Sequence, residues 1–342
     1  QANEGVSTVN LRGLGSSRTL VLINGKRHVS TESIGVDISA IPSIAIGRVE
    51  VLKDGAAALY GSDAIAGVVN FITRDNFEGL ELKASYKNIE DSDGDTSIAG
   101  IYGKQIENFH FTVSAEYSER SELNVKDRDW ALRPFSENPG GGYSGIGNPG
   151  TIYPTLGSTI IAGAKPDTQC AALGGQQDTS CRFPFIFFDN LIEDQETIKL
   201  FGEFTVDIND NLRFYMEGLY SDMNMDEWKT SPSYPPQSLV GADRVLQANH
   251  PGLIDYKAQN PDAFSDVDLT AAGIGVIPAE AQGAIVISRM LGVAGRNGKP
   301  ESSYRDTETK RVAGGFEGSL SNGIDFDISA SWSERLREIG GS

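Results

Sequence analysis

The chain has 342 residues, and its 47 acidic against 29 basic side chains give a formal net charge of −18, which argues against nucleic acid as a partner because phosphates are neutralised by surplus Lys and Arg. Hydrophobic residues make up 39%, and no run of about 18 apolar residues marks a membrane-spanning helix. Two cysteines and three histidines exclude a disulfide-built miniprotein. After these exclusions two classes remain, a soluble β-rich protein and a membrane β-barrel, whose strands keep half their residues polar.

The N-terminal part of the chain, at 1–76, predicts a small α+β unit. Asn24-Gly25 is a strong hairpin signal between two short apolar runs, and glycines punctuate the later changes of direction. The expected elements are strands at 19–23, 27–29, 48–52 and 67–73, a short helix at 39–46 that contains Pro42, and a helical turn at 56–60.

From residue 79 the dominant pattern is alternation with a period of two, which predicts strands. In residues 109–118 the odd positions are Phe, Phe, Val, Ala and Tyr, whereas the even positions are polar or small. Phe201 is the one residue that breaks the polar face of its own strand. About seven strands are expected, at 80–86, 96–103, 109–118, 197–208, 212–221, 312–320 and 324–332.

The connections between these strands alternate between short and long. Tight links are expected at 104–108, 209–211 and 321–323, whereas an acidic link at 89–95 and long loops at about 119–195 and 223–304 stand between them. Successive antiparallel strands turn at opposite ends of a sheet, so all tight turns fall at one end. This asymmetry is typical of outer-membrane barrels, which have short periplasmic turns and long extracellular loops. It favours a barrel over a soluble β-sandwich, in which the strands also alternate.

Seven strands would leave two open edges, and unpaired backbone groups cannot face lipid. The strands are therefore expected to be part of a larger closed sheet. An α+β unit that leads directly into barrel strands indicates a plug inside its own barrel.

The motifs of the first unit resemble the plug signature of the TonB-dependent outer-membrane receptor family. They follow the family's order and spacing: VNLRGLG at 9–15, TLVLINGKR at 19–27, IP at 41–42, RVEVLKDG at 48–55, ALYGS at 58–62 and AGVVNFITR at 66–74. The signature residues are Arg12, Gly13, Gly15, Asn24, Gly25, Arg48, Glu50, Tyr60, Gly61, Gly67 and Asn70.

The resemblance implies a plug domain at 1–76, followed at 77–342 by the first strands of a 22-stranded transmembrane β-barrel in the bacterial outer membrane. It further implies energised uptake of a scarce ligand, such as an iron-siderophore, cobalamin or an oligosaccharide, by a monomeric barrel whose partners are outer-membrane lipid and the TonB complex. The family's TonB box and early plug strands would precede Gln1, so the chain looks like a fragment. A passive porin-like channel and a soluble carbohydrate-binding β-sandwich are the alternatives.

In such a barrel the polar strand face would line the lumen and contact the plug, and the apolar face would meet lipid. The charged residues expected on the inner face are Lys199, Glu203, Asp207, Arg213 and Glu217. Arg12 and Arg48 with Glu50 are candidates for buried ion pairs or hydrogen bonds that fix the plug in the barrel wall.

Cys170 and Cys181 lie in the first long loop. If that loop is outside the cell, the setting is oxidising and the pair should form a disulfide. A catalytic or metal-binding thiol pair is the alternative, although no histidine is near in sequence. Enzyme signatures are absent, so no catalytic residue, cofactor or metal is expected: Gly142-Tyr143-Ser144-Gly145 fails the nucleophile-elbow pattern because Ile146 takes the place of the last glycine.

Overall fold

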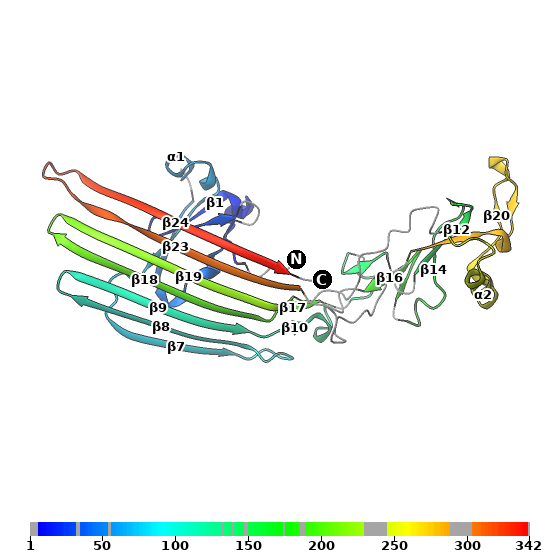
Figure 1. Ribbon diagram of the computed structural model, residues 1–342, viewed down its shortest axis with the longest axis horizontal. Helices are drawn as coiled ribbons and strands as arrows, with labels where there is room; N and C mark the ends of the chain where they lie inside the picture. The colour runs from blue at the N-terminus through cyan, green and yellow to red at the C-terminus, as the bar shows by residue number, and fades with distance from the viewer. Residues whose placement is uncertain are drawn as a thin grey trace. The chain divides into compact units, whose positions relative to one another are not determined.

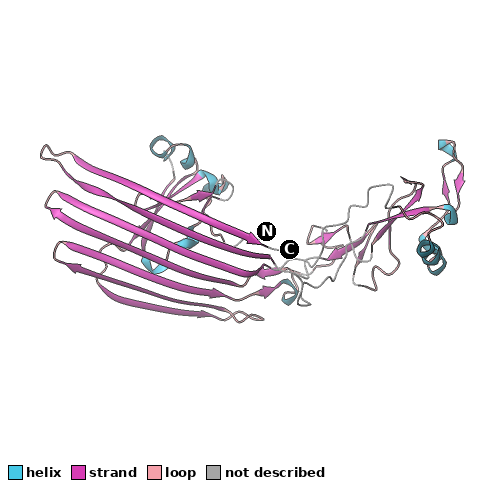
Figure 2. Ribbon diagram, in the orientation of Figure 1, coloured by secondary structure: helices cyan, strands magenta, loops and turns pink. Residues whose placement is uncertain are grey.

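The computed structural model describes residues 6–31, 35–53, 56–131, 133–138, 140–146, 150–173, 175–184, 189–228, 245–287 and 303–340. The chain divides into two units, residues 1–123 with 191–228 and 303–342, and residues 124–190 with 229–302. Strands dominate the described residues and helices are short (Figure 2). No helix in these described ranges is long and apolar enough to span a membrane.

The first unit begins with a small mixed sheet whose strand order is β2-β1-β6-β5. β1 pairs with β2 through the Asn24-Gly25 turn and runs parallel to β6, so β1 lies inside the sheet and is buried throughout. The elements are η1 (Leu11–Gly13), η2 (Ser16–Arg18), β1 (Thr19–Ile23), β2 (Lys26–Arg27), β3 (Ser30–Thr31), β4 (Gly35–Val36), η3 (Ile38–Ala40), η4 (Ser43–Ala45), β5 (Ile46–Leu52), α1 (Ala56–Tyr60), η5 (Ser62–Ala64) and β6 (Gly67–Thr73).

The helix expected at 39–46 is wrong. Two separate 3-10 turns, η3 and η4, stand there instead, with Pro42 as the residue that precedes the second turn. Proline lacks a backbone N–H and disfavours helical geometry in the residue before it, which ends the first turn at this point. Of the strand expected at 27–29 only Arg27 lies in a strand, β2, whereas the other expected elements of this region are present.

In the described part of the chain, seven long strands of the first unit form one antiparallel sheet in the order β24-β23-β19-β18-β9-β8-β7. The tight turns lie together at one end of this sheet, and the β7–β8 link and the long connections leave from the other (Figure 1). We call these the turn end and the loop end. The strands are β7 (Gly79–Lys87), β8 (Asp95–Ile106), β9 (Phe109–Arg120), β18 (Gln195–Asn209), β19 (Leu212–Trp228), β23 (Ser303–Ser319) and β24 (Asp325–Gly340).

One face of this sheet is polar and buried, and the other is apolar and exposed, which is the reverse of the arrangement in a soluble protein. Along β9 the polar even positions from His110 to Glu116 are buried, whereas Val113 and Tyr117 are exposed. The buried face is the one that the small sheet covers, so we call it the inner face. The exposed large apolar residues of the outer face include Leu80, Leu82, Ile98, Val113, Ile198, Leu200, Val312, Ile328, Trp332 and Leu336.

The second unit is built from parts of both long connections. β12 pairs with β22 from Thr151 to Thr155, which joins one stretch from each connection, and a core of Ile152, Leu253, Phe264 and Ala284 packs around this pair. Its elements are η6 (Val125–Asp127), β11 (Tyr143–Ser144), β12 (Thr151–Leu156), β13 (Thr159–Ile160), β14 (Lys165–Pro166), β15 (Gln176–Gln177), β16 (Cys181–Pro184), α2 (Pro251–Gln259), η9 (Pro261–Ala263), β20 (Val267–Asp268), η10 (Thr270–Ala272), β21 (Val276–Ile277), η11 (Ala279–Ala281) and β22 (Gly283–Ile287). Short strands β10 (Leu123–Asn124) and β17 (Asn190–Ile192) stand where the chain passes between the units.

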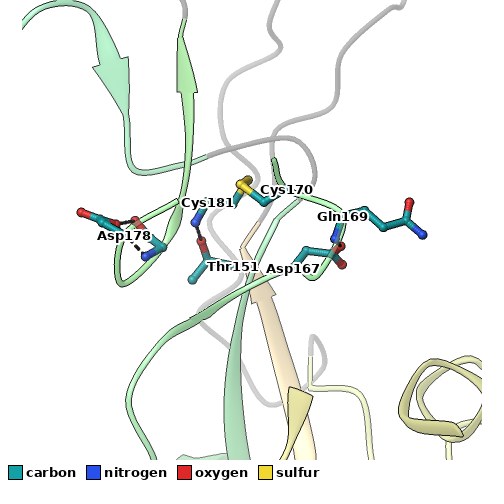
Figure 3. The surroundings of a disulfide bond; sticks show 7 residues. Thr151, Asp167, Gln169, Cys170, Asp178 and Cys181 are labelled. Atoms are coloured by element: carbon teal, nitrogen blue, oxygen red, sulfur yellow. Dashed lines mark hydrogen bonds between the residues drawn. A yellow bond between two sulfur atoms is a disulfide. The ribbon is translucent and has the colours of Figure 1, made fainter. Parts of the chain in front are cut away.

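Cys170 and Cys181 form the predicted disulfide inside the second unit (Figure 3). Both cysteines are fully buried, and the Cys181 backbone N–H donates to Oγ1 of Thr151 at 3.0 Å. A side chain on Gly175 would meet both sulfur atoms, because its Cβ would lie 2.6 and 2.7 Å from them. The bridge is therefore a packed element of this unit.

Candidate functional site

The candidate site is the interface between the small sheet and the inner face of the seven-stranded sheet. One apolar contact is an anchor formed by Phe201 of β18 and Leu219 of β19, which are opposite each other in the strand register, and a second joins Ile44 of η4 to Ala99 and Ile101 of β8. Phe201 and Leu219 are buried in the same cluster as Val21, Ile23 and Phe71 of the small sheet. Phe201 interrupts the polar pattern of its strand because it packs against this core.

Polar contacts surround that anchor and centre on Asn24. The Asn24 side-chain N–H₂ donates to Oε2 of Glu217 at 2.7 Å and lies 3.4 Å from Oε2 of Glu203, and the Thr73 hydroxyl donates to the same Glu203 oxygen at 2.7 Å. The side-chain oxygen Oδ1 of Asn24 accepts from the Thr73 backbone N–H at 3.0 Å, which fixes the orientation of the side-chain amide. One turn residue thus bridges two strands of the larger sheet.

A buried ion pair completes this group. Nη1 of Arg311, on β23, lies 2.6 Å from Oε1 of Glu217, and the two side chains are 0% and 5% exposed. Nε of Arg311 donates to the backbone carbonyl of Arg27 at 3.3 Å. Glu203 and Glu217 are direct cross-strand neighbours, an arrangement in which like charges repel, so the Arg311 cation and the Asn24 amide are what make the pair tolerable. We call Asn24, Thr73, Glu203, Glu217 and Arg311 the central cluster.

Further contacts tie the small sheet and its connections to other strands, and two of them involve Glu116 and Asp37. Oε2 of Glu116, on β9, accepts from the backbone N–H and the hydroxyl of Ser43 at 2.7 and 2.8 Å, while Nζ of Lys199 lies 2.8 Å from the other oxygen. Oδ2 of Asp37 lies 3.4 Å from Nη2 of Arg335 on β24. Strands β9, β18, β19, β23 and β24 each supply a charged side chain to this interface.

His28 is buried near the central cluster, at 5% exposure. Burial, with the neighbouring charges of Arg311 and Arg335, lowers the pKa of His28 from 6.5 to about 3. The imidazole is therefore neutral at physiological pH.

The inner-face prediction is met in part. Lys199, Glu203 and Glu217 contact residues of the small sheet or their partners, as expected. Asp207 and Arg213 instead pair with each other at 2.6 Å near the turn end. Sequence reasoning missed Glu116, Thr73, Asp37, Arg311 and Arg335, although Glu116 and Arg311 stand at inner positions by strand parity, which is a signal that could have found them.

The signature residues mostly shape turns. Arg12, Gly13 and Gly15 have φ of 57°, 69° and 103°, and Gly61 and Gly67 have φ of 85° and 133°. Gly67 also has no room for a side chain, because a Cβ would lie 2.6 Å from the backbone oxygen of Leu52.

Four further signature residues hold the hairpin and its neighbours. Oδ1 of Asn70 accepts from the Gly25 N–H at 2.9 Å, and the backbone carbonyl of Tyr60 accepts from Arg27 at 2.7 Å. Asn24 is the signature residue that reaches the strands. The sequence predicts only a turn at Asn24, whereas the structure shows that its side chain also contacts Glu217 on β19.

The expected burial of Arg48, Glu50 and Arg12 is not found. Arg48 and Glu50 do pair, at 2.8 Å, but they are 66% and 51% exposed, and Arg12 is exposed as well. Arg48 and Glu50 lie on β5, which is an edge strand of the small sheet, and every residue of β5 after Ile46 is exposed. Among the described residues, no group of three or more His, Cys, Asp or Glu side chains could hold a metal ion.

Comparison with known proteins identifies the small sheet. Residues 1–68 match the family model described as the TonB-dependent receptor plug domain. The iron-regulated outer membrane virulence protein of Vibrio cholerae serotype O1 is 42% identical over 73 residues, which are 19% of this chain and 11% of that protein.

Solved structures similar to this chain include a mutant of the ferric enterobactin receptor from Pseudomonas aeruginosa in complex with enterobactin, with 13% identity and a TM-score of 0.43 over 96% of this chain and 34% of that one. The siderophore receptor PirA from Acinetobacter baumannii has 15% identity and a TM-score of 0.41, over 96% of this chain and 37% of that one. The chain thus spans about a tenth of the curated relative and about a third of each solved structure. The similarity at the level of sequence thus lies in the N-terminal part of the chain, where residues 1–68 match the plug domain of TonB-dependent receptors.

Proposed function

We propose that this chain forms the plug and the first strands of a bacterial outer-membrane transporter, which takes up a scarce ligand with energy supplied by the TonB complex. The plug domain is residues 1–76, and residues 77–342 supply barrel strands together with their long extracellular connections. The single observation that carries the proposal is the reversed polarity of the seven-stranded sheet, whose apolar face is exposed and whose polar face the plug covers.

An exposed apolar face of this kind is explained by lipid. Leu82 is 74% exposed, Ile328 69% and Trp332 54%, and they stand on two different strands. A soluble sandwich would bury such residues between two sheets, so this alternative is not favoured. The proposed bilayer supplies the apolar environment that the sheet lacks.

The edges of the sheet support a larger barrel. Within the described ranges, β7 and β24 each have a neighbour on one side, and backbone groups left unpaired on the other side could not face lipid. We expect the complete barrel to close through further strands, and 22 is the number that the family resemblance implies.

The plug distinguishes a gated transporter from a passive porin-like channel. The central cluster, Ser43 with Glu116, and Asp37 with Arg335 bind the plug to five strands of the sheet. A lumen so occupied requires energy before a solute can pass, which the pull of the TonB complex on the plug would provide. A monomeric barrel suffices for this mechanism.

Iron chelates are the first ligands to test, because a relative that shares 42% of the aligned plug residues is named as iron-regulated. Cobalamin and oligosaccharides are the other classes carried by such receptors. The test is growth of a strain that depends on this gene under iron limitation, with and without a functional TonB. Growth that persists without TonB would contradict energised uptake.

A second measurement addresses the barrel and the plug directly. The full-length protein is reconstituted in planar bilayers and compared with a variant that lacks residues 1–76. We expect negligible steady current from the first and a large steady current from the second. A large current from the full-length protein would favour the porin-like channel, and recovery of the protein in the soluble fraction without detergent would end the barrel proposal.

A further inference from the structure

The inner face of β23 and β24 carries a ladder of arginines. Arg305 and Arg311 belong to β23, while Arg337 and Arg335 of β24 lie opposite Thr307 and Thr309 in the register. One guanidinium therefore stands at each inner-facing level of β23 from 305 to 311. Successive levels are about 7 Å apart along a strand, so the four arginines span roughly 20 Å from the loop end toward the plug.

In the loop-end part of these two strands, the carboxylates lie on the outer face only. The inner positions from 305 to 311 and from 333 to 337 are Arg, Thr, Thr, Arg and Ser, Arg, Arg, without a carboxylate. The acidic residues of the same stretches alternate with them and therefore point outward: Asp306, Glu308, Glu334 and Glu338. In a chain with a net charge of −18, a one-sign row on one face is unexpected, and neighbouring like charges in it repel.

Arg311 and Arg335 each have a buried side-chain nitrogen without a hydrogen-bond partner among the described residues. Arg311 uses Nη1 for Glu217 and Nε for the Arg27 carbonyl, whereas its Nη2 is buried without a hydrogen-bond partner among the described residues. The Arg335 side chain is 3% exposed, and its Nε is likewise buried without a partner in that part of the chain. Buried N–H donors that lack an acceptor are costly, so their retention indicates an acceptor that arrives from outside.

Asp37 of the plug already occupies one position on the ladder. Its Oδ2 lies 3.4 Å from Arg335, a long distance for a charge-assisted contact. Its Oδ1 accepts from the backbone N–H groups of Ser7 and Ser39 at 3.2 and 3.0 Å and from the Ser39 hydroxyl. Asp37 can therefore release Arg335 and still keep its hydrogen bonds within the plug.

From this arrangement we propose that the arginine ladder binds an oxyanion-bearing ligand, a carboxylate or phosphate compound, and that the ligand displaces Asp37 from Arg335. The inference rests on the proposed transport function and names the charge class of its ligand. Arg305 and Arg337, which are nearer the loop end, contact the anion first. The anion then binds Arg335 as the contact between Asp37 and Arg335 breaks. Binding then removes one of the contacts that hold the plug to β24, so the arrival of ligand loosens the element that must move.

The test measures binding of the trianionic dye pyranine to the purified full-length protein in detergent, by fluorescence anisotropy at fixed ionic strength. Arg335→Gln and Arg337→Gln should each weaken binding about tenfold or more, because a charge-assisted hydrogen bond is lost. Arg213→Gln is the matched control, an inner-face arginine near the turn end, and should bind within about twofold of the parent protein. Asp37→Asn keeps the acceptor for Ser7 and Ser39 but removes the competing charge, so it should tighten binding about threefold or more.

The Asp37→Asn arm keeps the test decisive if an arginine variant folds poorly, since damage to the fold does not improve affinity. Equal binding by the parent, Arg335→Gln and Arg337→Gln would overturn the proposal, as would an Asp37→Asn protein that binds no tighter. Displacement of the dye by citrate or by inorganic phosphate shows which oxyanion is preferred, and displacement by neither contradicts the ladder. If the parent and the arginine variants bind the dye equally, and the protein is nevertheless plugged and embedded in the outer membrane, only the arginine ladder is contradicted. If the protein is absent from the outer membrane, the proposed transport function is contradicted.

Discussion

The buried pair of Arg311 and Glu217 gives the sharpest test of how the plug is held. Their nitrogen and oxygen are 2.6 Å apart, with exposures of 0% and 5%, so neither charge can be hydrated while the plug is in place. Removing one partner of such a pair typically costs about 3–5 kcal/mol, because the other charge stays buried and unpaired. The protein can escape this cost by releasing the plug, which lets water reach the remaining charge.

We therefore expect Arg311→Gln to shift the equilibrium between docked and released plug by about 3–5 kcal/mol, which is roughly two to four powers of ten. The cost falls on Glu217 and on Glu203 opposite it, which would share the Asn24 amide without a cation. Single-channel recording in increasing urea measures the effect, since a released plug opens a conducting path. Plug release should begin at a clearly lower urea concentration in the variant.

A double-mutant cycle with Arg311→Gln and Glu217→Gln isolates the pair. Because the double variant buries no charge at these two positions, it should recover much of the stability that either single variant loses. Arg48 and Glu50 form a matched control pair, which is also close at 2.8 Å but mostly exposed, and such pairs are worth about 0–1 kcal/mol. A coupling energy for Arg311 and Glu217 no larger than that of the control pair would refute the reasoning.

Three further outcomes are expected. Gly175→Ala should hinder the disulfide and expose free thiols to a thiol reagent, whereas Gly163→Ala, where a Cβ meets nothing within 4 Å, should not; equal thiol counts would contradict the packing argument. The folded pKa of His28, about 3, lies below its unfolded value of 6.5, so its contribution to plug stability is complete above pH 6.5 and should fall by about 1.4 kcal/mol per pH unit as pH drops toward 3. His28→Gln should flatten that acid dependence in urea titrations, and an unchanged profile would assign it to other groups. Leu200→Arg places a charge on the outer face and should destabilise the protein in lipid vesicles by about 2–4 kcal/mol, while a negligible effect would argue against a bilayer around that face.

Alternation predicted the seven strands but not their full length. The expected strand at 212–221 continues to Trp228, and the one expected from 312 begins at Ser303, so the second long connection starts after 228 rather than at 223. The outward positions in these extensions include Asp222, Asp226 and Asp306, where apolar residues would be needed to continue the pattern. Backbone pairing goes on where the hydrophobic signal stops, because pairing depends on the neighbouring strand and not on side-chain polarity.

Contacts between distant parts of the chain were out of reach of any local pattern. β12 lies in the first long connection and β22 in the second, so their pairing makes one unit from two connections that read as separate loops. The Asn24-Gly25 turn could be predicted from its two residue types, yet the two glutamates that the Asn24 side chain bridges, Glu203 and Glu217, lie on strands far along the chain. Strand parity can place a charged residue on the inner face, but only the fold determines which plug residue meets it.

The composition of the plug interface fits the proposed role of the plug as an element that both seals and moves. Its apolar part is small, with Phe201 and Leu219 in the plug core and Ile44 packed against Ala99 and Ile101 of β8, and many of the other contacts are hydrogen bonds and ion pairs. Apolar contacts lose about 25 cal/mol per Å² when water replaces them, whereas a hydrogen bond exchanged for one to water loses only about 0.5–1.5 kcal/mol net. A polar interface is therefore specific while it is dry and inexpensive to separate once water enters. Under the proposed anion binding, the same property would make the interface sensitive to ligand, because an anion that replaces Asp37 on Arg335 exchanges one ion pair for another and leaves the plug with one contact fewer.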